Sequence, residues 1–393
     1  MPWKGQTMEE RRETFARRVM SKEATKSALC RQYGISRPTG DKWIGRYVRG
    51  EPMSDRSKAP FHTPNRTTYE TECRIVEMRE KYPAIGAKKL KRMLESKGYS
   101  APAYSTINAI LHRNGLITKE ASEAAKPSVR FEKSTPNEMW QADFKGHFTM
   151  KDGQRCHPLA VIDDHSRFCL CLDARENEKY EGVKNSLITA FEEYGLPETI
   201  LCDNGNPWGT VQSVGYTRFE VWLMELGILT KHGRIHHPQT QGKEERFNGT
   251  VLKELLRHRE IENMAHAQTV FEEYRLFYNN ERPHHALSLG FPSQRYRSSE
   301  RKLPKCIEEW EYDQGCMVRR VKGSGYLTVK GQGYFLSEAF GDKQVGIRDS
   351  DDNEGNVLWV LYRQFCIAKL DVDERVVLAR RPFIPTCSVR VNV

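Results

Sequence analysis

Three acidic side chains in distant parts of this 393-residue chain have the types and settings that a metal site requires. Asp143 lies in the phrase Trp-Gln-Ala-Asp-Phe and Asp203 in Leu-Cys-Asp-Asn-Gly. Glu245 lies in the longer phrase His-Pro-Gln-Thr-Gln-Gly-Lys-Glu-Glu-Arg-Phe-Asn. Carboxylate oxygens are preferred ligands of hard divalent cations, and two such cations can drive attack on a phosphodiester. If the fold brings the three carboxylates together, they have the chemistry to cut and join a nucleic-acid strand.

The two aspartates occupy settings that favour a functional role. Asp143 lies in an apolar stretch that predicts a strand, where a charge is costly unless it is paired or bound to a metal. Asp203 directly follows the short apolar stretch 199–202, and catalytic side chains of α/β sheets commonly lie just past a strand's carboxyl end. Each residue also has an ordinary interpretation, because Asp-Asn-Gly is a common turn and a strand rim can be exposed.

Glu245 belongs to the stretch 242–259, which has helical spacing. Val251 and Leu255 lie on the apolar face of this predicted helix, and Glu245 lies at the edge of that face. Three cations that we predict to contact phosphates lie on a different face: Lys243, Arg246 and Lys253. The alternative is an ordinary amphipathic helix with a solvated charged face.

The charge of the chain is unevenly distributed. The net charge is +10, but residues 1–130 hold 27 Lys and Arg against 14 Asp and Glu, a net of +13, so the remainder has a net of −3. A cationic segment of this kind favours a polyanion through the release of counterions. The alternative is a basic surface that serves only solubility.

Composition indicates a cytoplasmic protein. No run of about 18 apolar residues occurs, so we expect no membrane span. The first residues lack the apolar stretch of a signal peptide. The ten cysteines are scattered without a Cys-x-x-Cys pair, which predicts reduced and mostly buried thiols.

The N-terminal region predicts a helix-turn-helix domain at residues 1–50. Ala24, Ala28 and Leu29 share a helical face, Gly34 ends that helix, and Ser36 is placed to cap the next one. We predict base or backbone contacts to DNA from four residues of this second helix: Arg37, Thr39, Lys42 and Arg46. A plain helical hairpin would give the same pattern.

A second helix-turn-helix domain is predicted at residues 67–118, between the polar linkers 51–66 and 119–136. Its helices are expected at 71–81, 87–97 and 106–114, with Ser105 capping the last. In the middle helix Leu90, Met93 and Leu94 face inward and the lysines face outward. The candidate DNA contacts of this domain are Lys88, Lys89 and Ser105.

From residue 137 the pattern changes to mixed α/β. Strands are expected at 140–148, 159–162, 168–172, 199–202 and 228–231, with helices at 179–194, 219–226, 242–259 and 268–278. Residues 137–300 therefore predict one α/β domain. Short Gly-rich segments at 310–372 predict a small all-β domain, and a loosely ordered tail is expected at 373–393.

In their order along the chain, these phrases resemble the retroviral-integrase-core superfamily, and in particular bacterial insertion-sequence transposases. The matching phrases surround Asp143, Asp203 and Glu245. Two others are the strand that runs into Asp163 and Asp164 and the tail Tyr-Asn-Asn-Glu-Arg-Pro-His-His-Ala-Leu at 278–287. The resemblance covers roughly residues 20–300.

The resemblance implies a ribonuclease-H-like integrase core with a mixed sheet, and a small SH3-like barrel at the C-terminus. It implies that Asp143, Asp203 and Glu245 are catalytic and bind two Mg²⁺ ions, for which Mn²⁺ substitutes. Glu245 is preferred to Glu244 because it directly precedes Arg-Phe in the motif. Four further residues are expected to support the site: Asp163, Asn204, Gln239 and Asn248.

The function implied is that of a transposase that binds the terminal inverted repeats of an insertion sequence and catalyses DNA cleavage and strand transfer. Double-stranded DNA and further copies of the chain are the expected partners, near the bacterial nucleoid. The alternatives are a non-catalytic DNA-binding regulator derived from a transposase and a ribonuclease-H-like nuclease. The C-terminal domain is either a plain packing module or a further DNA-contacting domain, for which four cations are candidates: Arg319, Arg320, Lys322 and Lys330.

Overall fold

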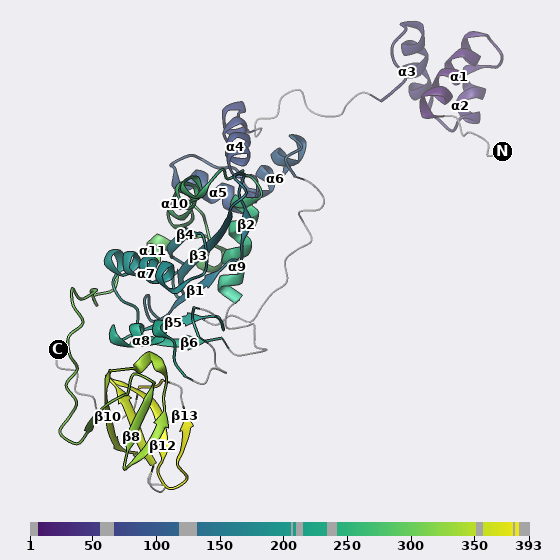
Figure 1. The fold of residues 1–393 in the computed structure, drawn as a ribbon. Coiled ribbons are helices and arrows are strands. Elements are labelled where there is room, and N and C mark those ends of the chain that lie inside the picture. The colour runs from purple at the N-terminus through teal and green to yellow at the C-terminus, as the bar shows by residue number, and fades with distance from the viewer. Residues whose placement is uncertain are drawn as a thin grey trace. The chain divides into compact units, whose positions relative to one another are not determined.

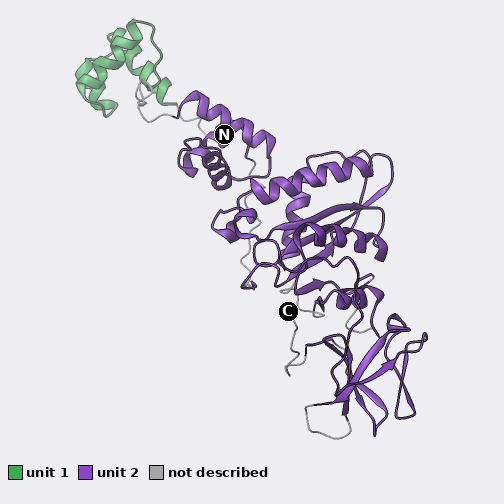
Figure 2. Ribbon diagram, turned by 90° about the vertical axis from the view of Figure 1, so that its left-hand side faces the viewer, with its two compact units in different colours: residues 1–66 green, residues 67–393 purple. Residues whose placement is uncertain are grey.

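The computed structural model describes most of the chain, in two compact units that comprise residues 1–66 and 67–393 (Figure 2). Within the described ranges, no helix combines the length and apolarity that crossing a membrane requires. The described residues are 7–55, 67–117, 132–205, 207–209, 215–233, 242–350, 357–379 and 382–384.

The first unit consists of α1 (Met8–Met20), α2 (Lys26–Gln32) and α3 (Arg37–Val48). Its core is formed by Phe15, Leu29, Cys30 and Trp43. Gly34 follows α2 with a φ of +66°. The turn requires this left-handed conformation, which glycine adopts without steric cost.

Ser36 caps α3 as predicted, because its side chain accepts a hydrogen bond from the backbone N–H of Thr39. The prediction that Ala24 shares a helical face with Ala28 and Leu29 was wrong. Thr25 caps α2, so Ala24 precedes the helix and is exposed instead of sharing its buried face.

A second group of helices begins the larger unit: α4 (Tyr69–Lys81), α5 (Ala87–Ser96) and α6 (Tyr104–Arg113). They enclose a core that includes Ile75, Leu90, Met93, Ile107 and Leu111. Ser105 lies inside α6 and does not cap it, contrary to expectation. The extended backbone of Ala103 takes the cap position, and the helix therefore begins one residue before Ser105.

The α4–α6 group packs directly on the rest of its unit. The rings of Tyr82 and Phe277 stack with centroids 4.4 Å apart and an interplanar angle of 9°. Lys97 forms an ion pair of 2.8 Å with Glu281. Phe277 also extends the hydrophobic core of the group. These helices are therefore held against the end of α10 (Met264–Asn280) by stacking and charge.

The centre of the larger unit is a mixed sheet of six strands (Figure 1). The strand order is β2-β3-β1-β5-β6, with β4 paired to β3. β1 runs antiparallel to β3 and parallel to β5, which confirms the predicted mixed sheet. The strands are β1 (Trp140–Phe144), β2 (Phe148–Thr149), β3 (Arg155–Asp163), β4 (Cys169–Arg175), β5 (Thr199–Cys202) and β6 (Leu229–His232).

Helices cover both faces of this sheet. Leu159 and Val161 of β3 pack with α7 (Tyr180–Tyr194) and α8 (Arg218–Glu225). The alternate residues Ala160 and Ile162 pack with α9 (Gly242–Val251) and α10. The strand is buried on both sides, because successive side chains of a strand point to opposite faces.

The chain after α9 departs from the prediction of one helix through residue 259. A π-helical turn, η3 (Leu252–Leu256), follows α9 directly, and the helix ends there. The segment beyond α10 forms the turn η4 (His285–Leu287) and the short helix α11 (Pro292–Arg295).

The C-terminal region is all-β, as predicted. One antiparallel sheet has the order β13-β12-β11-β10-β7, and β8 pairs with β9 in a hairpin. The strands are β7 (Met317–Arg320), β8 (Tyr326–Val329), β9 (Gln332–Phe335), β10 (Gln344–Asp349), β11 (Val357–Tyr362), β12 (Phe365–Asp371) and β13 (Val376–Ala379), with the turn η5 (Glu338–Phe340).

We expected a loosely ordered tail from residue 373. This prediction was wrong for residues 376–379, which form β13 and hydrogen-bond to β12. The β region is also fixed to α8. Lys343 Nζ lies 2.5 Å from a carboxylate oxygen of Glu225, and the Tyr362 hydroxyl donates to the same oxygen over 2.9 Å.

Candidate active site

Asp143 faces α9 because of its position in β1. Trp140 and Ala142 point into the core beneath α7 and α8, so Gln141 and Asp143 point to the other face. Burial, followed by the charge of Asp203, raises the pKa of Asp143 to about 6. The strand thus holds a carboxylate where its negative charge is poorly solvated.

Asp203 is the first residue after β5, at the same edge of the sheet. The parallel pairing of β1 with β5 sets Ala142 opposite Cys202, so the next residue of each strand is an aspartate. The Asn204 backbone N–H donates to Asp203 over 2.7 Å, and the Asn204 side chain donates to the carbonyl of Gly233. Asn204 therefore ties the loop after β5 to the chain after β6.

The first turn of α9 presents two glutamates in different ways. Glu244 is 1% exposed, whereas Glu245 is exposed. Burial, and then the charges of Asp143 and Asp203, raise the pKa of Glu244 far above its ordinary range. Asn248 lies one turn further on and donates to Asp143 over 3.1 Å. Because Asn248 is three residues from Glu245 and four from Glu244, it neighbours both on the helix surface.

These groups form an excess of negative charge with incomplete hydrogen bonding. The Oε1 atom of Glu244 and the Oδ1 atom of Asn248 are buried without a hydrogen-bond partner. Such groups are costly unless a cation or donor satisfies them. Carboxylate and amide oxygens suit Mg²⁺, so the donor chemistry fits a divalent cation. No three His, Cys, Asp or Glu side chains converge on one metal position among the residues that the structure describes.

The strand end beside this site is held by buried carboxylates. Asp163 accepts hydrogen bonds from the backbone N–H of Asn137 and from the backbone and hydroxyl of Ser166. Burial raises the pKa of Asp163 despite these bonds. Asp164 accepts from Gln141 over 2.6 Å. Asp163 and Asp164 therefore anchor the chain around β1.

Three family comparisons cover most of the larger unit. The integrase core domain matches residues 133–238, and a second integrase core domain family matches 226–290. The C-terminal domain of IS481 family transposases matches residues 316–378. The central sheet thus matches an integrase core domain, and the all-β region matches a C-terminal domain of transposases.

Curated relatives come from bacterial insertion elements. The uncharacterized 31.7 kDa protein of insertion element IS407 from Burkholderia multivorans is 25% identical over 245 residues, which cover 61% of this chain and 86% of the relative. The transposase for insertion sequence element IS21 from Pseudomonas aeruginosa is 25% identical over 281 residues, which cover 67% and 70%. In its domains and its relatives, the chain is similar to the insertion-sequence transposases of the integrase superfamily.

Solved structures similar to this chain include the HTLV-2 integrase catalytic core domain in complex with magnesium. It is 19% identical, with a TM-score of 0.32, over 41% of this chain and 97% of that one. The simian T-cell lymphotropic virus intasome in complex with the PP2A regulatory subunit B56 gamma is 14% identical, with a TM-score of 0.38, over 73% and 91%.

The cations predicted to contact DNA from α9 separate into two groups. Arg246 and Lys253 are exposed. Lys243 instead directs its ammonium at Asp164, 2.6 Å away. Burial lowers the pKa of Lys243 to about 8 although the bond to Asp164 raises it. Lys243 thus already has a carboxylate partner inside the α/β core.

Among the candidates in the two helical groups, Arg37, Lys42, Lys88 and Ser105 are exposed, and Thr39 hydrogen-bonds to Ser36. Gln239 lies outside the described residues. One predicted position was wrong for contact with a surface ligand. Arg46 is 6% exposed and donates to the carbonyl of Ser54, because residues 51–55 fold back over α3. Lys89 is half-buried because the α4–α6 group packs on the chain around Arg282.

Sequence reasoning missed a histidine beside Asp203. His232 lies at the end of β6, with its Nε2 atom 3.0 Å from Glu220 and its Nδ1 atom 3.3 Å from the carbonyl of Asp203. Burial lowers the pKa of His232, but Glu220 outweighs it and leaves the pKa above its ordinary value. Thr217 and Glu220 form a capping box, and Thr-x-x-Glu was the one visible signal of this anchor.

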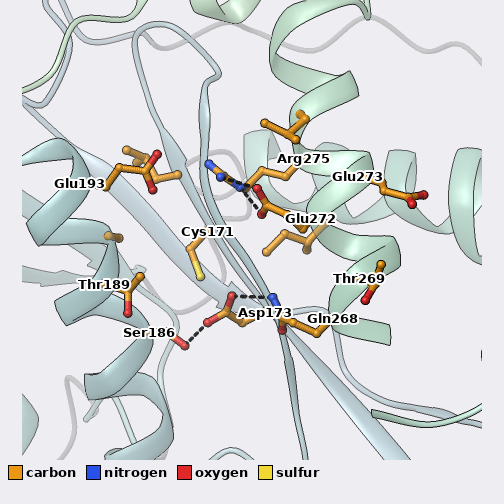
Figure 3. Close-up of a pocket in the computed structure, with 14 residues that line it drawn as sticks. Cys171, Asp173, Ser186, Thr189, Glu193, Gln268, Thr269, Glu272, Glu273 and Arg275 are labelled. Atoms are coloured by element: carbon orange, nitrogen blue, oxygen red, sulfur yellow. Dashed lines mark hydrogen bonds and ion pairs between the residues drawn. The ribbon is translucent and has the colours of Figure 1, made fainter. Parts of the chain in front are cut away.

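A separate cavity of 590 Å³ lies over β4, between α7 and α10 (Figure 3). The candidate catalytic acids are not among its lining residues. Asp173 lines it and accepts from Ser186 over 2.5 Å. Its other carboxylates are Glu193, Glu272 and Glu273. This lining repels a polyanion, so the cavity does not suit a nucleic acid.

Proposed function

We propose that this transposase cleaves the ends of an insertion sequence and joins them to target DNA. The observation that carries the proposal is the pair Asp143 and Asp203, set side by side at one sheet edge and facing a helix that bears further carboxylates. Their mutual repulsion has the sign that a divalent cation would relieve. The matched integrase core domain supplies the class of reaction.

Asp143, Asp203 and Glu245 would hold two Mg²⁺ ions, or Mn²⁺ in their place. When bound, the ions would supply an activated attacking oxygen and stabilisation of the leaving 3′ oxygen. The similar HTLV-2 core domain was solved in complex with magnesium. Asn248 would orient Asp143 through its hydrogen bond, and Asn204 and His232 would hold the loop that carries Asp203.

Glu245 is our choice for the third ligand. The motif frame supports it, and its exposed carboxylate can reach a metal that must also touch DNA. Glu244 is buried beside Asp143, and burial together with the charges of Asp143 and Asp203 raises its pKa, which favours the protonated form. The two residues therefore have different roles in this proposal: Glu245 binds metal, and Glu244 is a buried neighbour of the site.

The DNA partner would be double-stranded, with the terminal inverted repeats bound by the two helical groups in a helix-turn-helix manner. The exposed Arg37, Lys42 and Lys88 would contact it, together with Arg246 and Lys253 of α9. Two element ends must be processed together, so we propose that the chain acts as a homo-multimer on DNA. The similar viral structure is named an intasome.

A joining assay tests this function. Purified protein is incubated with Mg²⁺ or Mn²⁺, a labelled terminal-repeat duplex and a target plasmid. Labelled plasmid is the expected product. Binding without nicking in either metal would instead indicate a non-catalytic regulator, and cleavage confined to RNA–DNA hybrids would indicate a ribonuclease-H-like nuclease.

A further inference from the structure

A cluster of cations lies where α5, η3 and the segment after α10 meet. We name it the cationic junction and define it as Lys88 and Lys89 of α5 with Arg282 and His285 of the 278–287 tail motif. Glu254 of η3 lies among them. The motif was conspicuous in the sequence, yet the catalytic chemistry proposed above does not use it.

The charge of Arg282 is already paired with the carboxylate of Glu254. Its Nε atom donates to Glu254 over 2.6 Å and its second guanidinium nitrogen over 2.7 Å, in a forked pair. The two side chains are 8% and 10% exposed. The Tyr274 hydroxyl also donates to Glu254 over 3.1 Å. Both oxygens of this carboxylate are therefore occupied, and Glu254 has little capacity left for another cation.

His284 does not add a counter-charge. Its Nε2 atom lies 3.2 Å from the Arg282 guanidinium and therefore accepts a hydrogen bond. Burial, and then the charge of Arg282, lower the pKa of His284 to about 2. The ring is neutral and serves only to fix Arg282.

Lys89 is the cation of the junction whose charge has no direct partner among the described residues. It is half-buried, and its ammonium makes no hydrogen bond or ion pair with any residue that the structure describes. Burial, and then Arg282, lower the pKa of Lys89 to about 8, although Glu254 opposes this. Burial together with Lys89 and Lys88 also lowers the pKa of His285. The cations disturb one another because positive charge exceeds negative charge here.

A purely structural role does not explain Lys89. If this position only joined α5 to the tail motif, an apolar side chain of the same length would pack there at lower cost. Lys88 extends the cluster to the surface, where its ammonium lies 5.1 Å from the ring of Tyr104. An excess of positive charge that opens to the surface is suited to an anion.

We propose that the cationic junction binds a phosphate of the DNA backbone, with Lys88, Lys89 and His285 as its contacts and the Arg282–Glu254 pair as its support. This rests on the proposed function, because it presumes a DNA ligand. Glu254 lies ten residues after Glu244 along α9 and η3, which corresponds to about 15 Å. One DNA strand that follows this helix could therefore reach both sites.

The test compares Lys89→Met with Lys89→Arg in the full-length protein. Fluorescence anisotropy gives the affinity for a labelled terminal-repeat duplex at several salt concentrations. We expect Lys89→Met to weaken binding several-fold and to reduce the slope of log K against log salt by about 0.9, the value for one phosphate contact. Lys89→Arg keeps the charge and should retain the slope.

Lys91→Met is the matched control, because Lys91 lies on the same helix and is already paired with Glu95. It removes the same charge and should leave the slope unchanged. Lys88→Met repeats the test at an exposed position where folding is not at risk. Thermal unfolding of each variant checks that the fold is intact.

The proposal is overturned if Lys89→Met and Lys88→Met give the same slope as Lys91→Met while the wild-type protein binds the duplex. Failure of the wild-type protein to bind any DNA would be a different result, because it would remove the proposed function itself.

Discussion

The two ends of the helix formed by α9 and η3 lie in regions with an excess of opposite charge. At its start, burial and the charge of Asp203 raise the pKa of Asp143, and burial and the charges of Asp143 and Asp203 raise the pKa of Glu244, which indicates too much negative charge. Near its end, burial and the charge of Arg282 lower the pKa of Lys89, which indicates too much positive charge. In both places the fold holds like charges together. The comparison supports our proposals that each end binds a ligand of the opposite sign.

The Arg282–Glu254 pair is an example of a buried ion pair in which each charge has a partner, and Glu254 lies in the η3 turn of the same helix. Its two charges are buried, but each has its partner in forked geometry. Glu244 is also buried and Lys89 is half-buried, yet neither has a charge partner of that kind among the described residues. Burial alone therefore does not mark a binding site; burial without a counter-charge does.

The largest effect is expected at the acidic end. Glu245→Gln should slow DNA cleavage at least about a thousandfold, because it removes a metal ligand that acts on the transition state. Glu244→Gln should change the rate less than tenfold, because glutamine resembles the protonated glutamic acid. Single-turnover cleavage rates measure both. The reverse ranking would reassign the third ligand to Glu244.

The next largest effect is a loss of stability when the Arg282–Glu254 ion pair is broken. Arg282→Met leaves Glu254 charged and buried, and should lower the free energy of unfolding by about 3–5 kcal/mol. Arg259→Met is the matched control, because the Arg259–Glu273 pair is exposed, and it should cost at most about 1 kcal/mol. Equal losses in urea unfolding would show that the Arg282–Glu254 pair does not support the junction.

Metal binding should stabilise the acidic end measurably. At a hundred times its dissociation constant, Mg²⁺ is expected to add about 2.7 kcal/mol to the free energy of unfolding. Asp203→Asn removes a ligand and should lose most of this gain. Thermal unfolding with Mg²⁺ and with EDTA gives the comparison. A gain that persists in Asp203→Asn would place the metal elsewhere.

The smallest effect is expected for the residue that orients Asp143. Asn248→Ala removes one hydrogen bond to that carboxylate, a loss of about 1 kcal/mol, which corresponds to roughly a fivefold slower cleavage. The cleavage rate at saturating Mg²⁺ measures it. A loss as large as that of a metal ligand would mean that Asn248 does more than orient Asp143.

Much of the fold could be predicted from the sequence because local patterns determine it. The apolar stretches of β1, β3 and β5 predicted the central strands. The position of Asp203 follows from the end of the predicted strand 199–202. The position of Asp143 does not, because one strand was expected over 140–148, whereas β1 ends at Phe144. Gly34 and Ser36 marked a helix end and a helix start, and both positions proved right.

The rest depended on packing between segments distant in sequence. Lys89 faces outward on an isolated helix, and only the docking of α4–α6 beside Arg282 covers it. Arg46 is buried because residues 51–55 fold back, which linker composition does not reveal. Glu244 and Glu245 differ by about 100° around α9, and the packing of the helix on the sheet determines which one turns inward.

The most direct test of the account is the joining reaction of Asp143→Asn beside the wild-type protein. Both proteins are given a labelled terminal-repeat duplex, a target plasmid and Mg²⁺, and binding to the duplex is measured in parallel. We predict joined product from the wild type alone, with equal binding by both proteins. Joined product from Asp143→Asn at the wild-type rate would contradict the assignment of the catalytic centre.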